Sequence, residues 1–546
     1  MQKRWTWFIA LALIIGLLAG CSNNDGNSGS SASPSASAGG DASGSPSASP
    51  SAAAGEAKEG GTLIVGLSGD PLSFNPDGTG DDFMYPIAQN VFNRLVKINN
   101  KQQIIPDLAE SWEVTDDGLQ YTFRLHSGVK WHDGQAFTSK DVKFTLEAIK
   151  SNSGFASTFL AGIADIATPD DNTVVVKLSK PDAAFIGYLA WYGTFILPEH
   201  VYGSNWAGGT GTNPIGTGPF KFDGYKAGVS VNLVKNPDYF AQVPHVDKLI
   251  FSIITDPNTM VQAFYNGEID ILGGDPPASE LDAMMNDSKV RVVTSLWPSR
   301  VYLLFNFDRE PFNKPEVRQA IAYALNNDEI VAKAQKGQAQ VAKTFLSPVY
   351  DWAVSGDYAV PATDVDKAKQ LLEQAGLKPD KDGNYLSATL DIFEYNVYQD
   401  IATVIKDQLA KAGIKITINV SDYAAWEASV STDRKYDLSI LGGYQGPDVG
   451  AVKSRVGTGG PSNMMGYSNP ALDRLLEEGA TLVKEEERKA KYTEIQKILS
   501  EDLPIVPISE YVGSNPVQSY VRGEPGSEEA VGHTAFNEYS YVWLDK

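Results

Sequence analysis

Residues 103–149 read QIIPDLAESWEVTDDGLQYTFRLHSGVKWHDGQAFTSKDVKFTLEAI. The β-rich run at 121–125 predicts a strand, and the sequences DDG at 116–118 and HDG at 132–134 are typical of turns. The segment 138–141, TSKD, resembles a capping box ahead of VKFTLEAI, so a helix is expected to begin there. The stretch therefore combines strands, tight turns and a capped helix, as a mixed α/β chain does.

The same alternation continues along the chain. A helix over 364–375 is expected to end at Gly376, and a helix over 401–412 at Gly413, because glycine suits the left-handed position after a helix. That second helix is followed by a strand, a helix from Tyr423 and a further strand. This order predicts a βαβ unit with parallel strands. The strands of this unit are expected at 414–420 and 436–441. Further strands are expected at 62–66, 173–178, 301–307 and 388–393.

The N-terminal residues predict export. Lys3 and Arg4 precede an apolar run over 5–18 that is too short for a membrane span, and a small pair precedes Cys21, so residues 1–20 are interpreted as a signal peptide. Residues 18–21, LAGC, resemble a lipobox, which makes Cys21 the expected site of lipidation. Residues 21–59, rich in Ser, Ala, Gly and Pro, are expected to form a disordered tether.

Composition limits the possible functions. The formal net charge of −22 argues against a nucleic-acid partner. Cys21 is the only cysteine, so the chain can form no internal disulfide and must be stabilised by its core. The length of the body predicts at least two lobes rather than one core.

Catalytic signatures are missing from the sequence of the body. It contains no GxSxG elbow, no HExxH and no GxxxxGK[ST], and its five histidines are not spaced as a metal site. The sequence therefore favours a binding protein over an enzyme, and neither a cofactor nor a metal is expected. A glycosidase carboxylate pair stays open, although nothing favours it.

Several long motifs in the same order resemble the family 5 extracellular solute-binding proteins, the peptide/nickel class. Besides 103–149, these are GGTLIVGL with PLSFNP (60–76), IGTGPFKFDGYKAGVSVNLVKNPDYF (215–240), VQAFYNGEIDIL (261–272), LLFNFDREPFNKPEVRQAIAYALN (303–326) and DQLAKAGIKITINV (407–420). The resemblance implies an α/β, two-lobed periplasmic-binding-protein-like fold of class II, the large cluster C type, with an accessory subdomain inserted in lobe I. It places lobe I at 56–95, 212–303 and 507–546, the accessory subdomain at 96–211, and lobe II at 304–506.

The resemblance also implies the function. Such a protein captures peptides in the cleft between its lobes and delivers them to the permease of an ABC importer. We expect an exported monomer, anchored by lipid on Cys21 to the outer face of the cytoplasmic membrane, as in Gram-positive bacteria, or facing the periplasm. Alternatives are an oligosaccharide or other non-peptide solute, a nickel chelate, or a receptor role for peptide pheromones.

The resemblance places ligand contacts in the loop after the first strand and at the end of the strand 436–441. Aromatic side chains elsewhere are further candidates, with core packing as the alternative for each of them. The expected ligand-binding residues are Ser68, Gly69, Asp70, Tyr85, Trp297, Tyr302, Tyr395, Trp426, Gly442, Gly443, Tyr444, Gln445 and Asp448.

Three of these residues carry specific expectations. Glycines at 442 and 443 would let a ligand backbone approach the strand edge and pair with it. In peptide-binding members of the family an aspartate after this strand pairs with the ligand's α-amino group, and Asp448 is the only acidic residue here that could correspond to it. The chain reads GYQGPDVG where the family has a tryptophan, Ala-Asp-Tyr and Pro-Asp-Pro, so a structural turn role for Asp448 is the alternative.

Overall fold

The computed structural model describes residues 56–78, 81–152, 156–206, 213–336, 338–527, 530 and 532–546. The predicted signal peptide, the lipidation site Cys21 and the tether up to residue 55 lie outside the described residues. The segment 57–546 is a compact unit. No helix in its described part is both long and apolar enough to cross a membrane.

A first four-stranded sheet contains the first strand of this unit. Its order is β1-β10-β9-β8, with β1 and β10 parallel and the other neighbours antiparallel. Its core includes Leu63, Phe251 and Ile271, which are fully buried. The strands are β1 (Thr62–Leu67), β8 (Phe220–Lys226), β9 (Ser230–Lys235) and β10 (Lys248–Ile253), with helices α1 (Met84–Val91), α5 (Pro257–Tyr265) and α6 (Ala278–Met285) in the same half.

The signature stretch of the sequence forms a second, antiparallel sheet with its own core. Its order is β4-β5-β7-β6, and helix α2 contributes Leu146 and Ile149 to the core beneath it. The expected capping box is confirmed in part, because Asp141 accepts a hydrogen bond from the backbone N–H of Thr138 at 2.9 Å. The elements are β4 (Ala109–Val114), β5 (Gln120–Leu125), α2 (Ser139–Asn152), β6 (Ile163–Asp170), β7 (Thr173–Leu178), α3 (Phe185–Leu189) and α4 (Glu199–Tyr202).

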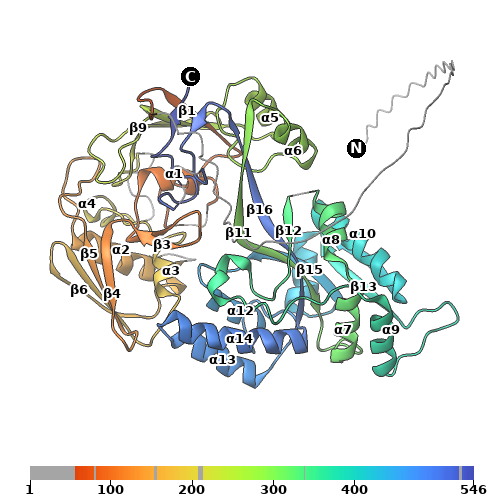
Figure 1. Cartoon of the computed structure of the whole chain (residues 1–546). Helices are drawn as coiled ribbons and strands as arrows, with labels where there is room; N and C mark the ends of the chain where they lie inside the picture. Colours follow the sequence, from red (N-terminus) through yellow and green to blue (C-terminus); the bar gives the residue numbers. More distant parts are fainter. Residues whose placement is uncertain are drawn as a thin grey trace, which may run out of the picture. The chain divides into compact units, whose positions relative to one another are not determined.

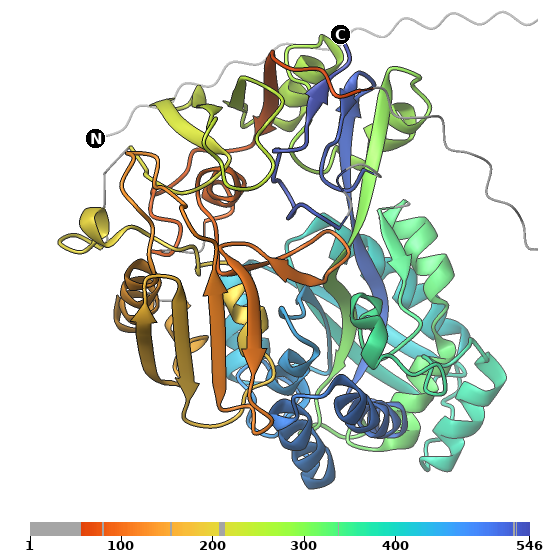
Figure 2. The same cartoon turned by 60° about the vertical axis from the view of Figure 1, so that its left-hand side comes forward.

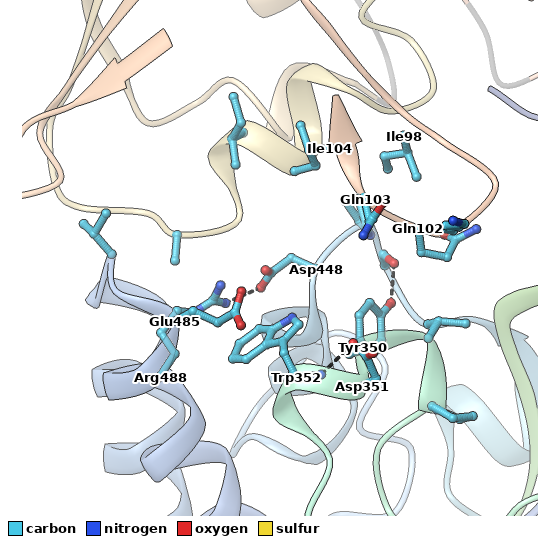
Figure 3. A pocket seen from close by; sticks show the side chains of 18 of the residues that line it. Ile98, Gln102, Gln103, Ile104, Tyr350, Asp351, Trp352, Asp448, Glu485 and Arg488 are labelled. Carbon is cyan, nitrogen blue, oxygen red and sulfur yellow. Dashed lines mark hydrogen bonds and ion pairs between the residues drawn. The ribbon is translucent and has the colours of Figure 1, made fainter. Parts of the chain in front are cut away.

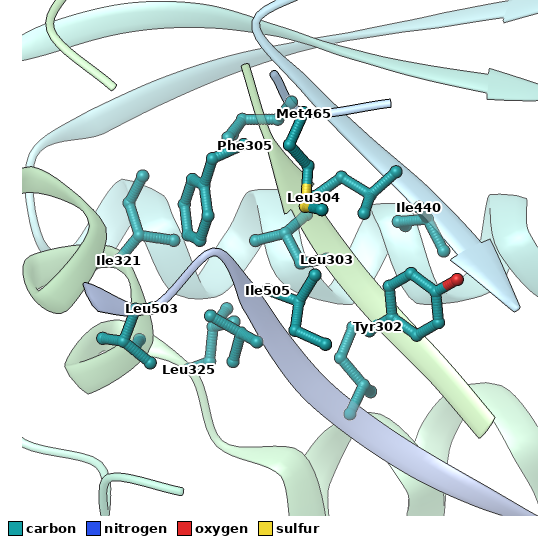
Figure 4. Close-up of a cluster of buried hydrophobic side chains, with 14 of the residues drawn as sticks. Tyr302, Leu303, Leu304, Phe305, Ile321, Leu325, Ile440, Met465, Leu503 and Ile505 are labelled. Carbon is teal, nitrogen blue, oxygen red and sulfur yellow. The ribbon is translucent and has the colours of Figure 1, made fainter. Parts of the chain in front are cut away.

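The six-stranded sheet has the order β12-β16-β11-β15-β13-β14 and carries the largest core. Figure 4 shows part of this core, where residues of β11 and β16 pack against α7. Its strands are β11 (Val290–Phe305), β12 (Ala339–Val341), β13 (Leu386–Phe393), β14 (Ile414–Ser421), β15 (Leu438–Tyr444) and β16 (Ile505–Gln518).

Helices pack around this sheet, and several begin or end at the residues that the sequence predicts. Pro315 starts α7, Asp364 caps α9 by accepting from Lys367 N at 2.9 Å, and Gly376 and Gly413 follow α9 and α10 with φ of 85° and 75°. The helices are α7 (Pro315–Ala324), α8 (Asn327–Ile330), α9 (Val365–Gln374), α10 (Asn396–Lys411), α11 (Tyr423–Trp426), α12 (Val452–Val456), α13 (Pro470–Thr481) and α14 (Glu485–Asp502).

The βαβ prediction is confirmed with one detail added. β13 pairs in parallel with both β14 and β15, so the crossover from β14 to β15 passes over β13. Short pairs β2 (Val96–Ile98) with β3 (Ile104–Pro106) and β17 (Val521–Arg522) with β18 (Trp543–Leu544) complete the sheets.

Two long strands run through the unit. β11 and β16 are antiparallel partners, and Figure 1 shows them passing from the region of α5 and α6 to the large sheet. Their register shifts between Leu296 and Arg300, where Trp297, Pro298 and Ser299 form a bulge. The sequence predicted a strand only over 301–307, whereas the strand of the structure begins before Pro298. Pro298 lies in the bulge, which is where a strand tolerates proline.

Separate cores and sheets give the two-lobed α/β fold with an inserted subdomain that the sequence predicts. The predicted domain boundaries themselves stay a prediction. The inserted sheet lies beside α13 and α14 in both views (Figure 2), and the backbone N–H of Ala183 donates to the carbonyl of Ala480 at 2.8 Å. The inserted subdomain therefore contacts the half of the chain that carries the large sheet.

Candidate ligand-binding site

A cavity of about 820 Å³ lies where these parts meet. The bulge of β11, the end of β15, the start of α10 and the segment before α6 all contribute to its walls. Cavities of this size suit a small solute rather than a macromolecule. Its aromatic lining residues are Tyr85, Trp191, Tyr192, Trp297, Tyr395, Tyr398, Tyr444 and Tyr511.

Stacked ring pairs build two of the walls. The rings of Trp191 and Tyr444 are parallel within 4°, with centroids 4.4 Å apart. Tyr85 and Tyr192 stack at 4.4 Å with an angle of 20°. Such walls give a ligand a large apolar contact area at low cost in side-chain entropy, since the rings are already held by one another.

The bulge in β11 directs Trp297 into the cavity. Its ring is held edge-on by Phe536, with centroids 4.6 Å apart, and it packs against Gly513, where a Cβ would lie 3.1 Å from the indole nitrogen. A regular strand would send consecutive side chains to opposite faces, whereas a bulge re-aims one of them. The bulge around Pro298 therefore places an aromatic side chain in the wall of the cavity.

One edge of β15 faces the cavity. β15 pairs with β11 along its whole length, but its parallel pairing with β13 covers only Leu438 and Ser439. Gly442 and Gly443 line the cavity beyond that point. Gly443 has φ of 134°, and a Cβ there would meet open space, so the backbone itself forms this part of the wall. A ligand can approach the strand closely here.

Acidic groups outnumber basic ones in the lining. Asp82, Asp275 and Asp400 line the cavity together with Lys336 and Arg300. The guanidinium of Arg300 is already bound to the carboxylate of Glu510 and to the carbonyls of Thr344 and Phe345. Burial raises the pKa of Glu510, and Arg300 opposes that shift. Arg300 therefore has its charge balanced by the protein, and Lys336 is the remaining cation of the lining.

Six of the predicted ligand-binding residues line this cavity: Tyr85, Trp297, Tyr395, Gly442, Gly443 and Tyr444. Gln445 lines a smaller adjacent cavity of about 240 Å³, and its amide nitrogen donates to the carbonyl of Gly443 at 2.6 Å. The end of β15 is thus brought together with aromatic residues that lie far away in the sequence.

The loop after the first strand lies elsewhere. Asp70 accepts hydrogen bonds from the Tyr225 hydroxyl and the Gly228 N–H, both at 2.8 Å. Gly69 is buried against the ring of Phe83, where a Cβ would lie 2.7 Å from ring carbons. These contacts explain Gly69 and Asp70 as parts of a turn, and Ser68, Gly69 and Asp70 are not among the residues lining the cavity.

Two aromatic candidates belong to the core. Tyr302 is fully buried within the large core in Figure 4, with the guanidinium of Arg455 at 4.8 Å from its ring centroid. Trp426 is 1% exposed, and its indole N–H donates to the Ser439 hydroxyl at 3.1 Å. For both, packing explains the aromatic side chain, which was the stated alternative.

Asp448 lines a second cavity, of about 770 Å³, between the inserted sheet and the large core (Figure 3). Its carboxylate pairs with Arg488 at 2.6 Å and caps a short helix by accepting from Gly450 N at 2.7 Å. Burial lowers the pKa of Arg488, but the carboxylate of Asp448 outweighs it, so the pKa is raised. These contacts favour the turn role for Asp448 over an α-amine contact.

The sequence did not single out Trp191, Tyr192, Asp275, Tyr398 or Tyr511. Tyr398 and Tyr511 carry no local signal, because they come from the first turn of a helix and the middle of a strand. Asp275 follows two glycines after a buried segment, GGDPP at 273–277, a pattern that could have been recognised as a close backbone approach. In the described part of the chain no group of three or more metal-ligating side chains occurs.

Comparisons with known proteins agree on one family. Residues 103–456 match the model of the bacterial extracellular solute-binding proteins, family 5. The chain is 31% identical over 475 residues to the oligopeptide-binding protein AppA of Bacillus subtilis, covering 83% of this chain and 86% of that protein.

Solved structures share the fold. The ABC transporter substrate-binding protein CtaP from Listeria monocytogenes matches with a TM-score of 0.79 at 29% identity, over 90% of this chain and all of that one. The binding protein AgaA of A. tumefaciens R10, solved with agropinic acid, matches with a TM-score of 0.69 at 29% identity, over 89% of this chain and 99% of that one.

Proposed function

Because this chain belongs to the bacterial extracellular solute-binding proteins of family 5, we propose that it captures peptides in the 820 Å³ cavity and delivers them to the permease of an ABC importer. The family is one of transport binding proteins, which supports a role in capture rather than catalysis. Export follows from the family, whereas a lipid anchor on Cys21 and a monomeric state belong to this proposal.

The glycine-bearing edge of β15 carries the peptide assignment. Gly442 and Gly443 line the cavity with backbone, and β13 does not pair with β15 beyond Ser439. The Tyr398 hydroxyl lies against the backbone at Gly442, and the carbonyl of Gly443 accepts from the amide of Gln445. An extended peptide that displaces the Tyr398 hydroxyl could pair with this edge through its own amides, so that affinity would depend little on its side chains. The similarity to an oligopeptide-binding protein supports the same ligand class.

The proposed ligand-binding residues are Tyr85, Trp191, Tyr192, Trp297, Tyr395, Tyr444 and the glycines at 442 and 443. Gly442 and Gly443 would provide the edge and the aromatic rings the walls. Lobe I, lobe II and the accessory subdomain would each contribute, at the domain boundaries that the sequence predicts.

Titration calorimetry with trialanine and pentaalanine tests the proposal. Ala278 lies in the first turn of α6 and lines the cavity, so Ala278→Trp should place a large ring inside the site and obstruct peptide binding. Ala471 is exposed in the first turn of α13, away from the cavity, and Ala471→Trp is the matched control. The proposal fails if no peptide binds while a sugar oligomer raises the thermal midpoint, since a ligand stabilises the state that binds it.

A further inference from the structure

Asp275 presents an oriented carboxylate to the main cavity. One carboxylate oxygen accepts a hydrogen bond from the Ser514 N–H at 2.6 Å, and the other accepts from the hydroxyl of Tyr511. The side chain stays accessible from the cavity. Each oxygen keeps a further lone pair, so the carboxylate can accept additional hydrogen bonds from a ligand.

The segment that carries Asp275 is fixed by the fold. Gly273 has φ of 79°, and a Cβ there would lie 1.8 Å from the carbonyl oxygen of Gly66, so only glycine lets the two backbones come together. The N–H of Gly273 donates to the side chain of Asn515 at 3.2 Å, and Gln338 donates to the carbonyl of Pro276 at 3.1 Å. Asp275 is thus held at a defined position.

The protein does not neutralise this carboxylate. Burial raises the pKa of Asp275, hydrogen bonds from Ser514 and Tyr511 oppose the shift, and no Lys, Arg or His of the described chain contributes to it. Among the other charged groups of the lining, Asp82 and Asp400 have the same sign, and the cation Lys336 does not contribute to the pKa shift of Asp275. A cation supplied by a ligand would therefore meet a carboxylate that has no counter-ion within the described chain.

The neighbouring surfaces also suit a cation. Tyr511 and Tyr395 are 40% and 52% exposed, and both line the cavity together with Trp297. Faces of such rings attract ammonium and guanidinium groups.

We propose that the cavity selects ligands with a cationic group, an ammonium or a guanidinium, which binds to the carboxylate of Asp275 between the rings of Tyr511, Tyr395 and Trp297. This inference rests on the proposed function and adds the charge of the ligand to it. It assigns to Asp275 the recognition of charge that the sequence had offered to Asp448.

Calorimetry with two matched peptide pairs tests the inference on the purified full chain. Trialanine against N-acetyl-trialanine isolates the α-ammonium, and N-acetyl-Ala-Lys-Ala against N-acetyl-Ala-norleucine-Ala isolates a side-chain ammonium. We expect neutralisation to weaken binding at least tenfold in at least one pair, and Asp275→Asn to reduce that preference to twofold or less.

Asp82→Asn is the matched control, because it removes a carboxylate of the same cavity, whereas the hydrogen bond of the Tyr511 hydroxyl is to Asp275. Asp82→Asn should retain most of the preference for the cationic peptide of each pair. An equal loss in both variants would contradict a defined site at Asp275, and peptide binding that ignores charge in both pairs would overturn the inference while leaving the proposed function intact.

If no peptide binds, the proposed function fails, and 1,5-diaminopentane against 1,5-pentanediol decides the inference separately. Binding of the diamine that is lost in Asp275→Asn would support it. Absence of binding would overturn it.

Discussion

The indole of Trp191 lies flat against the ring of Tyr444, with centroids 4.4 Å apart. Trp191 follows α3 of the inserted subdomain, whereas Tyr444 ends β15 of the large sheet. Nearby, Ala183 is hydrogen-bonded to Ala480, and a Cβ on Gly187 would lie 3.2 Å from the carbonyl of Pro447. The stack therefore joins two separately folded parts at the wall of the cavity.

We expect Trp191→Ala and Tyr444→Ala each to weaken peptide binding about tenfold, and the double variant to lose little more than either. Stacked rings are typically coupled by about 1 kcal/mol, and each variant removes the same pair. Titration calorimetry on the four proteins measures this coupling. Tyr423→Ala, at an exposed ring outside the cavity, is the control; purely additive losses would contradict a joint role.

Asp448→Asn should destabilise the protein by about 3 kcal/mol, because it leaves the largely buried Arg488 without its partner. Peptide affinity should change less than threefold, whereas an α-amine contact would cost well over tenfold. Urea denaturation and calorimetry measure the two effects.

The matched control is Asp308→Asn, in an exposed pair with Arg434 at 3.2 Å. It should cost less than about 1 kcal/mol. A large loss of peptide affinity in Asp448→Asn with little loss of stability would restore the α-amine role.

His132 should make the protein less stable in acid. Burial lowers the pKa of His132 to about 4, and its Nε2 lies 3.0 Å from the carbonyl of Gly218. Between about pH 6.5 and pH 4 the unfolded chain binds a proton that the folded chain does not, so stability falls as pH falls, by up to about 3 kcal/mol.

His132→Gln removes this proton and should flatten the fall in the free energy of unfolding between pH 7 and pH 4.5. The difference between the two proteins is the decisive quantity, because burial also raises the pKa of Asp107 to about 6, which acts with the opposite sign. Identical pH profiles for wild type and variant would contradict the assignment.

Gly273→Ala should disturb both stability and charge recognition. A Cβ would lie 1.8 Å from the carbonyl of Gly66 at a φ of 79°, so the segment carrying Asp275 must move. We expect the variant to lose its preference for cationic peptides and to melt at a lower temperature. Gly274→Ala, where a Cβ meets open space, should resemble the wild type; equal behaviour of the two variants would argue against a fixed segment.

The sequence predicted most of the fold because its signals are local. Caps and glycine stops placed α2, α7 and α9, and the βαβ order predicted parallel strands. α10 begins at Asn396, five residues before the predicted start, and β15 continues to Tyr444 through two glycines that were expected to end it. At these points tertiary pairing, with β11 for β15, outweighs local preference.

The site was predictable only where a local pattern marked it. Glycines after a strand identified Gly442 and Gly443, but no local feature distinguishes Tyr395, which lines the cavity, from Trp426, which is buried in the core. Asp275 and Tyr511 meet across 236 residues of sequence, so their contact depends on the tertiary fold. Asp448 was the residue that could correspond to the aspartate of the family pattern. Its partner Arg488 lies on another element, α14, so the sequence around Asp448 did not indicate the ion pair.

Native mass spectrometry of the full chain, purified without denaturation, would identify the ligand that the protein carries. Compounds that co-purify would be released and sequenced, with Ala278→Trp processed in parallel. We expect short peptides on the wild type, each with a free α-ammonium group or a basic side chain, and none on the variant. A sugar oligomer or other non-peptide solute on the wild type, or the same peptides on both proteins, would contradict it.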